Sequence, residues 1–241
     1  MPAYTLFNIY SMDVLYEDNH IIIVNKTTSE IVQGDKTGDT PLSETLKQWL
    51  KEKYNKPGNV FVGVTHRLDR PVSGIVVFAK TSKALSRLND MFRNGEIKKS
   101  YWAIVKDNPP KQQDEITHYL VRNEKQNKSY AYNTPKESAK EATLSYVVIA
   151  QSDRYKLLEI DLKTGRHHQI RCQLSKIGSP IKGDLKYGAR RSNPDGGISL
   201  HARRVSFIHP VSKKLIDVTA PVPDDALWHY FERELSASAI E

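Results

Sequence analysis

The residues best suited to chemistry lie in Thr65–Gly74, a polar segment between two apolar stretches of the chain. Asp69 stands between Arg67 and Arg70 in this segment, so its carboxylate is ionised at neutral pH. An ionised carboxylate held in this way suits covalent attack better than proton donation. Charge pattern alone favours the simpler interpretation, a surface loop with solvated ion pairs, and at this point both interpretations stay open.

A second polar segment, Leu162–Arg171, reads LKTGRHHQIR. A turn followed by a helix that begins near His167 would place Arg171 at the edge of an apolar stripe. A cation there needs a partner, unless it extends to solvent as a surface arginine. His167 and His168 do not indicate a metal site, because adjacent side chains on a helix point to different sides and no cluster of Asp, Glu or Cys accompanies them.

A third segment, Lys98–Val105, has the pattern of a strand with apolar residues on both faces. Tyr101, Ala103 and Val105 would share one face, with Trp102 on the other. A tyrosine in such a strand is ordinarily a core residue. Beside two lysines, its ring could instead stack on a nucleobase.

The elements that must position these segments are mostly short strands that follow one another through tight turns, with fewer helices between them. We expect helices of about three turns capped by Thr40 and Ser82, and a further helix at the C-terminus. A strand at Val60–Val64 and a hairpin in the lysine-rich stretch Val121–Lys140 are also expected. This pattern predicts an α+β fold, a mixed domain built on a largely antiparallel sheet flanked by helices.

The chain has 241 residues, of which 39% are hydrophobic, enough to bury a sizeable core. With no repeat or low-complexity linker, we expect one domain over 1–241, its core spanning about 14–221. A formal net charge of +8 favours a polyanionic partner such as nucleic acid. Met1–Tyr10 lacks the pattern of a signal peptide and no apolar run could span a bilayer, so we expect a soluble, cytoplasmic protein.

Six segments of the chain resemble, in order, the motifs of the RluA-type pseudouridine synthases of the RluA/RsuA family. HRLDRPVSG is similar to the family signature HRLDxxTSG. The others are IIIVNK at 21–26, KKSYWAIV at 98–105, TGRHHQIR at 164–171, GSPIKGD at 178–184 followed by YG, and LHA at 200–202. Six ordered motifs are far more specific than one. The chain is therefore identified as a member of this family, which converts uridines in RNA to pseudouridine.

The chain departs from the family pattern at a few loop positions. Val72 stands where the family usually has Thr, and Thr27 and Ser29-Glu30 replace the usual Pro and Gly. These changes bear on loop shape more than on chemistry. The catalytic motifs begin almost at once, so we expect a catalytic domain without the small N-terminal RNA-binding module of many relatives.

The resemblance implies three catalytic residues. Asp69 matches the catalytic aspartate, which attacks either the uracil ring or the ribose anomeric carbon. Arg171 matches the arginine that pairs with it, and a cation of this kind keeps a carboxylate ionised beside a flat base. Tyr101 matches the tyrosine that stacks on the base and assists removal of the C5 proton. No redox change or group donor enters the isomerisation, so no cofactor and no metal are expected.

Four further residues are expected to contact RNA. Arg67 matches an arginine that fills the gap left by the flipped-out nucleotide. Arg70 and Arg166 are expected to contact phosphates or form ion pairs, and His168 to order the TGRHHQIR segment. The implied partner is a ribosomal or transfer RNA stem-loop, with no obligatory protein partner.

Two other functions compete with this one. A catalytically silent RNA-binding protein would not need Asp69, Tyr101 and Arg171 together. A nuclease using His66 and Asp69 would need metal ligands or a second positioned base, and the sequence offers neither pattern.

Overall fold

The computed structural model describes residues 12–238, so Met1–Tyr10, where no signal peptide is expected, lies outside them. The strands are β1 (Val14–Glu17), β2 (Ile21–Lys26), β3 (Gly63–Val64), β4 (Ser73–Ala79), β5 (Lys98–Val105), β6 (Gln113–Asn123), β7 (Lys128–Tyr132), β8 (Lys140–Gln151), β9 (Lys156–Leu162), β10 (Leu200–Ile208) and β11 (Leu215–Thr219). The helices are α1 (Leu42–Lys53), α2 (Ser82–Arg93), α3 (Gln169–Lys176), the short 3-10 helix η1 (Leu185–Tyr187) and α4 (Ala226–Ser238).

The eleven strands of residues 12–238 belong to one sheet. Its order is β1-β2-β4-β10-β5-β9-β8-β6-β7, with β3 paired to β4 and β11 paired to β10. Within residues 12–238 every strand pair is antiparallel except β10 with β4. The predicted α+β fold on a largely antiparallel sheet is therefore confirmed.

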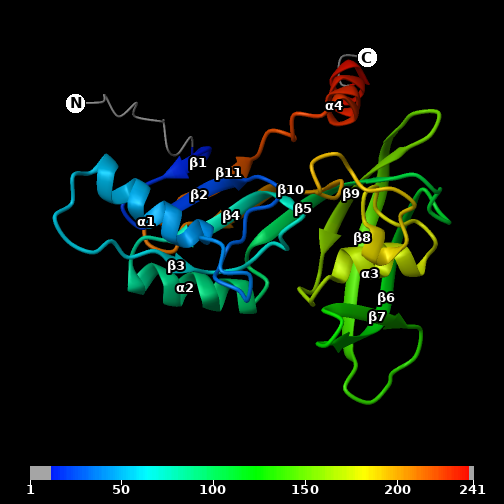
Figure 1. Ribbon diagram of the computed structural model, residues 1–241, viewed down its shortest axis with the longest axis horizontal. Coiled ribbons are helices and arrows are strands. Elements are labelled where there is room, and N and C mark those ends of the chain that lie inside the picture. The colour runs from blue at the N-terminus through cyan, green and yellow to red at the C-terminus, as the bar shows by residue number, and fades with distance from the viewer. Residues whose placement is uncertain (1–11, 239–241) are drawn as a thin grey trace.

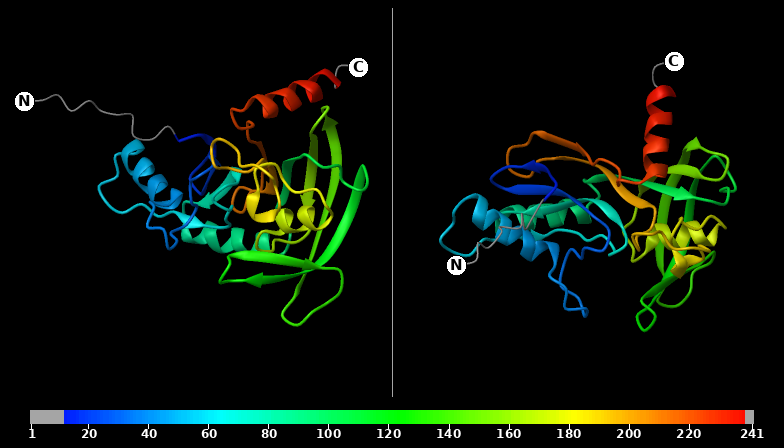
Figure 2. Two further views of the ribbon diagram at one scale, coloured as in Figure 1. Left: turned by 45° about the vertical axis from the view of Figure 1, so that its right-hand side comes forward. Right: turned by 45° about the horizontal axis from the view of Figure 1, so that its top comes forward.

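The sheet has two halves that meet at β10 and β5. Figure 1 shows β1, β2 and β4 with α1 and α2 in one half, and β6 to β9 with α3 in the other. Figure 2 shows the β6–β7 hairpin projecting from the second half, away from α4. The expected hairpin in the lysine-rich stretch is this one, with β6 starting earlier at Gln113.

The first four residues of β2, Ile21–Val24, are all apolar because helices cover both faces of the sheet there. Ile21 and Ile23 face the core that also contains residues of α2 and α3. Ile22 and Val24 face the core under α1. In β5 successive side chains point to opposite faces as predicted. Tyr101 lies in the core that contains residues of α2 and α3, whereas Trp102 packs against α4.

Three local expectations were wrong in detail. Pro41, which has no amide hydrogen to lose, is the N-cap of α1 in place of Thr40. Thr81, not Ser82, caps α2, since its side chain accepts the amide hydrogen of Ala84. Only Gly63–Val64 of the expected strand at 60–64 pairs with β4.

Candidate active site

The loop that carries Asp69 is fixed at its start by two side chains that bond to β4. Thr65 Oγ1 donates to the carbonyl of Val77 at 2.6 Å, and His66 Nε2 accepts the Val77 amide at 3.0 Å. Burial lowers the pKa of His66 to about 3, so the ring is neutral and its acceptor nitrogen is occupied. His66 therefore has no free acceptor nitrogen to serve as the base that the nuclease alternative required.

The other end of the loop is held by a buried lysine. Lys26 is 1% exposed, and its ammonium donates to the carbonyls of Thr27 at 2.7 Å, Arg70 at 3.1 Å and Val72 at 2.7 Å. Burial lowers the pKa of Lys26 to about 8. The Val72 amide in turn donates to the Asp69 carbonyl at 3.0 Å. Backbone groups thus set the turn, which explains how it tolerates valine where the family usually has threonine.

The loop then enters β4 at the one parallel contact of the described sheet, where β4 meets β10. Gly74 has φ +109°, and a Cβ there would lie 2.4 Å from the carbonyl oxygen of Ala202. Only glycine permits this approach. The adjacent Ser73 hydroxyl lies 2.9 Å from His201 Nδ1, a second link to β10.

Arg171 of α3 reaches Asp69 from the other half of the sheet. Its Nη1 donates to Oδ2 of Asp69 at 3.0 Å, while Nε and Nη2 bond to the two carboxylate oxygens of Asp184 at 2.7 and 2.9 Å. Arg171 is 5% exposed and Asp184 1%. Although burial opposes the charge, the two carboxylates more than offset it and raise the pKa of Arg171. The predicted pairing of Asp69 with Arg171 is present in the structure.

His168 lies buried between Asp69 and Tyr187. Its Nε2 is 3.4 Å from Asp69 Oδ2, and its Nδ1 is 2.9 Å from the Tyr187 hydroxyl. Its φ of +52° is left-handed, so α3 begins at Gln169 and not near His167. For the same reason the two adjacent histidine side chains do not point to different sides: their rings stack with centroids 3.8 Å apart.

Asp69 opens onto a small pocket of about 90 Å³ between the two halves. Apolar side chains line much of it, namely Leu68, Val72, Leu162, Ile170 and Leu200. Tyr101 also lines it, and burial together with the nearby Asp69 raises the pKa of its hydroxyl, so the phenol is neutral. A flat, largely apolar ring with an electronegative edge suits such a pocket.

The expected RNA-contacting arginines differ in their surroundings. Arg67 lines the pocket, is exposed, and makes no hydrogen bond or ion pair with any residue of the described chain. Arg166 also lines the pocket and donates from Nε to the Glu141 carbonyl at 2.9 Å. Arg70 turns away to the N-terminal half, where it pairs with Asp39 at 2.6 Å and Asp35 at 3.5 Å.

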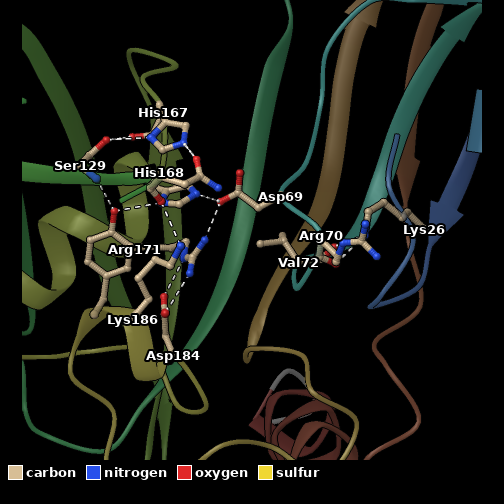
Figure 3. A network of polar contacts seen from close by, with 12 residues as sticks. Lys26, Asp69, Arg70, Val72, Ser129, His167, His168, Arg171, Asp184 and Lys186 are labelled. Carbon is tan, nitrogen blue, oxygen red and sulfur yellow. Dashed lines mark hydrogen bonds and ion pairs between the residues drawn. The ribbon is translucent and has the colours of Figure 1, made fainter. Parts of the chain in front are cut away.

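Sequence reasoning did not assign roles to three residues of this site. Lys26, Asp184 and Tyr187 all lie in segments that resemble family motifs, but their partners are distant in sequence or lie on other elements. Figure 3 shows Asp69 between two groups, with Arg171 and His168 on one side and Lys26 and Val72 on the other. A motif identifies such a residue without indicating which group its side chain hydrogen-bonds to.

A family model of RNA pseudouridylate synthases matches residues 20–176. Ribosomal large subunit pseudouridine synthase D of Zymomonas mobilis is 31% identical over 93% of the chain and 73% of its own length. tRNA pseudouridine synthase C of Pectobacterium carotovorum is 27% identical over 91% of the chain and 61% of its own. The chain thus spans about two thirds of the length of these curated relatives.

Among solved structures, Human RNA Pseudouridylate Synthase Domain Containing 4 superposes with a TM-score of 0.75 and 21% identity, covering 93% of each chain. This similarity confirms the fold. The family model and the relative at 31% identity show that the chain belongs to the RNA pseudouridylate synthase family, isomerases that act on RNA. The family membership and class of enzyme expected from the sequence are confirmed.

Two further observations concern residues 12–238. None of the helices in this range is long and apolar enough to cross a membrane. Over the same range, no three His, Cys, Asp or Glu side chains form a group that could hold a metal ion.

Proposed function

We propose that this enzyme isomerises uridines in ribosomal or transfer RNA, with Asp69 as the nucleophile. One observation carries the proposal: Asp69 opens onto a pocket sized for a small ring, with one carboxylate oxygen held by the buried Arg171. Asp184 binds Arg171 on its other side, so the guanidinium stays in place beside Asp69 and does not move toward the substrate. The names of the relatives given above support the two classes of RNA.

In the proposed reaction Asp69 donates an oxygen lone pair to the nucleoside. Attack on the ribose anomeric carbon expels uracil as an anion that keeps the electron pair of the glycosidic bond. Attack on the uracil ring at C6 moves the C5=C6 pair onto the ring carbonyl before the glycosidic bond breaks. In both routes the base turns, C5 bonds to the sugar, the carboxylate is released, C5 loses a proton and N1 gains one. The atoms balance without any cofactor or group donor.

Tyr101 would act first as a stacking surface. Burial, and secondarily Asp69, raise the pKa of its hydroxyl, so it is not a base while Asp69 is ionised. An ester at Asp69 carries no negative charge, which removes the second cause. Because C5 has a proton to lose only after it has bonded to the sugar, assistance by Tyr101 in removing that proton is proposed for that stage.

Arg67 is proposed to fill the space vacated by the flipped nucleotide, because its guanidinium is exposed at the pocket and has no partner in the described chain. Arg166 also borders a second groove of about 260 Å³, whose lining includes Arg122 and Lys140. Neither Arg122 nor Lys140 forms an ion pair within residues 12–238. We propose that RNA phosphates next to the target uridine lie along this groove.

All proposed catalytic side chains come from one chain, which supports catalysis without an obligatory protein partner. A cytoplasmic site of action is proposed because it would give access to ribosomal and transfer RNA. The net charge of +8 supports a polyanionic substrate there.

The function is tested by mapping pseudouridine in total RNA from cells with and without the gene, and then in transcripts of the affected RNA treated with the purified protein. We expect one or a few sites in ribosomal or transfer RNA to lose the modification and to regain it in vitro. An unchanged map, combined with RNA binding by the purified protein, would support the silent RNA-binding alternative.

A further inference from the structure

A chain of polar groups runs behind Asp69, away from the pocket. The Ser129 amide donates to the Tyr187 hydroxyl oxygen at 2.8 Å, and that oxygen lies 2.9 Å from His168 Nδ1. The opposite ring nitrogen, Nε2, lies 3.4 Å from Asp69 Oδ2. Figure 3 shows Ser129 and Asp69 on opposite sides of the His168 ring. The chain links a buried amide on β7 to the nucleophile.

The direction of each hydrogen bond follows from the fixed donor at one end. An amide can only donate, so the hydroxyl oxygen of Tyr187 is an acceptor toward Ser129. His168 Nδ1 is the sole acceptor within reach of the Tyr187 hydroxyl hydrogen among the described residues. A Tyr187 hydroxyl that donates to Nδ1 leaves the proton of a neutral His168 on Nε2.

The surroundings of His168 exclude the doubly protonated ring. His168 is 8% exposed, and burial, followed by the nearby charges of Arg171, His167, Lys186 and Arg122, lowers its pKa to about 2. A lowered pKa means that the ring gains its second proton only in strong acid. The opposite neutral tautomer would direct an Nε2 lone pair at the Asp69 carboxylate and leave the buried Tyr187 hydroxyl hydrogen without an acceptor.

We propose that Tyr187 fixes His168 in its Nε2–H tautomer, and that this N–H positions Asp69 by sharing Oδ2 with Arg171. The proposal rests on the function proposed above and makes His168 a positioning residue. Both donors meet the same oxygen, so Oδ1 receives no hydrogen bond from the described residues and keeps its lone pairs for attack. The 3.4 Å contact is longer than a typical N–H···O hydrogen bond, as is common in unliganded sites, and the proposed bond tightens when substrate binds.

The first test reads the tautomer directly. Two-bond ¹H–¹⁵N NMR of ¹⁵N-histidine-labelled protein distinguishes the two neutral forms, and a His168→Gln sample identifies the signal. We expect Nε2–H from pH 5 to 8 in the wild-type protein, and a mixture or the Nδ1–H form in Tyr187→Phe. An Nδ1–H ring in the wild type would overturn the proposal while leaving the role of Asp69 intact.

The second test measures single-turnover rates on one RNA. Loss of one positioning hydrogen bond predicts a fall of about 3- to 10-fold for Tyr187→Phe, with RNA affinity changed less than twofold. Tyr16→Phe is the control, since it removes a hydrogen-bonded tyrosine hydroxyl elsewhere in the fold, that of the half-buried Tyr16 on β1, which donates to Asp18. The control should keep the wild-type rate.

Double substitution separates positioning from general packing. Glutamine at position 168 can present an amide N–H to Asp69 and has no tautomer to fix, so His168→Gln should retain much of the rate that His168→Leu loses. In the His168→Gln background, Tyr187→Phe should then have little further effect. Equal losses from Tyr187→Phe in both backgrounds would show that the hydroxyl acts only through packing and would overturn the relay.

Discussion

The two sides of the pocket are built by different means. The loop that carries Asp69 is held at its far end through backbone carbonyls, which Lys26 of β2 binds, and at its start by the Thr65 and His66 side chains, which bond to the Val77 backbone on β4. The segment that carries Arg171 is held through side chains, chiefly the paired carboxylate of Asp184. The Arg70 and Val72 carbonyls that Lys26 binds are present whatever side chains stand there, whereas a side-chain network fails when one member is lost.

This difference explains where the chain can depart from its family pattern. Val72 replaces the usual threonine on the backbone-held side, where its amide and carbonyl are the groups that bond. On the other side the segment TGRHHQIR matches the family pattern at every specified position. Substitutions on the two sides should therefore have different consequences, and the following experiments test that expectation.

The largest effect is expected from Arg171→Ala. It frees Asp69 and leaves Asp184 buried without a cation, which should cost about 3–5 kcal/mol of folding free energy. Single-turnover rates should fall on the order of 10²- to 10³-fold, on folded and unstructured RNA alike. Urea unfolding and rates measured well below the unfolding transition separate the two losses. A variant with a near-normal rate would show that Arg171 is only structural.

Lys26→Met should cost less, because it removes a donor from three carbonyls but also removes a buried charge. We expect a loss of about 1–3 kcal/mol in unfolding free energy and a rate loss that parallels it. Lys125→Met, at an exposed position in the turn between β6 and β7, is the matched control and should change neither quantity. Full stability with lost activity would contradict the purely structural role of Lys26.

Arg67→Ala should discriminate between substrates. The planar guanidinium replaces stacking that is lost when the base flips out. The substitution should therefore raise the activation free energy by about 1–3 kcal/mol on a folded stem-loop and by little on a flexible strand. Single-turnover rates on both RNAs give the comparison, and Arg171→Ala is the reference variant whose rate should fall on both RNAs. Equal losses for Arg67→Ala would reassign it to an ordinary phosphate contact.

The smallest effect separates Arg166 from Arg70. Arg166→Ala should reduce the slope of log affinity against log salt by about one, as expected for one phosphate contact. Arg70→Ala should leave that slope unchanged, because Asp35 and Asp39 already compensate its charge. Binding titrations between about 50 and 300 mM salt measure both slopes. A lower salt slope for Arg70→Ala, with an unchanged slope for Arg166→Ala, would assign the phosphate contact to Arg70 instead of Arg166.

Most of the fold was predictable because runs of apolar residues in strands such as β2 and β5 indicate burial on both faces of the sheet. The sequence also predicted the pairing of Asp69 with Arg171, although only through the family resemblance. It could not predict that Asp184 locks Arg171, since 13 residues and a loop separate them. Nor could it predict the left-handed His168, because a positive φ at a histidine has no signature in the residue pattern.

The central claim, that Asp69 is the nucleophile, is tested most directly by pseudouridine formation with purified Asp69→Asn. Asparagine keeps the shape of the side chain but is a poor nucleophile. We expect no pseudouridine in single-turnover assays, with RNA affinity within a few fold of the wild type. Pseudouridine formed by Asp69→Asn at even a tenth of the wild-type rate would contradict the account.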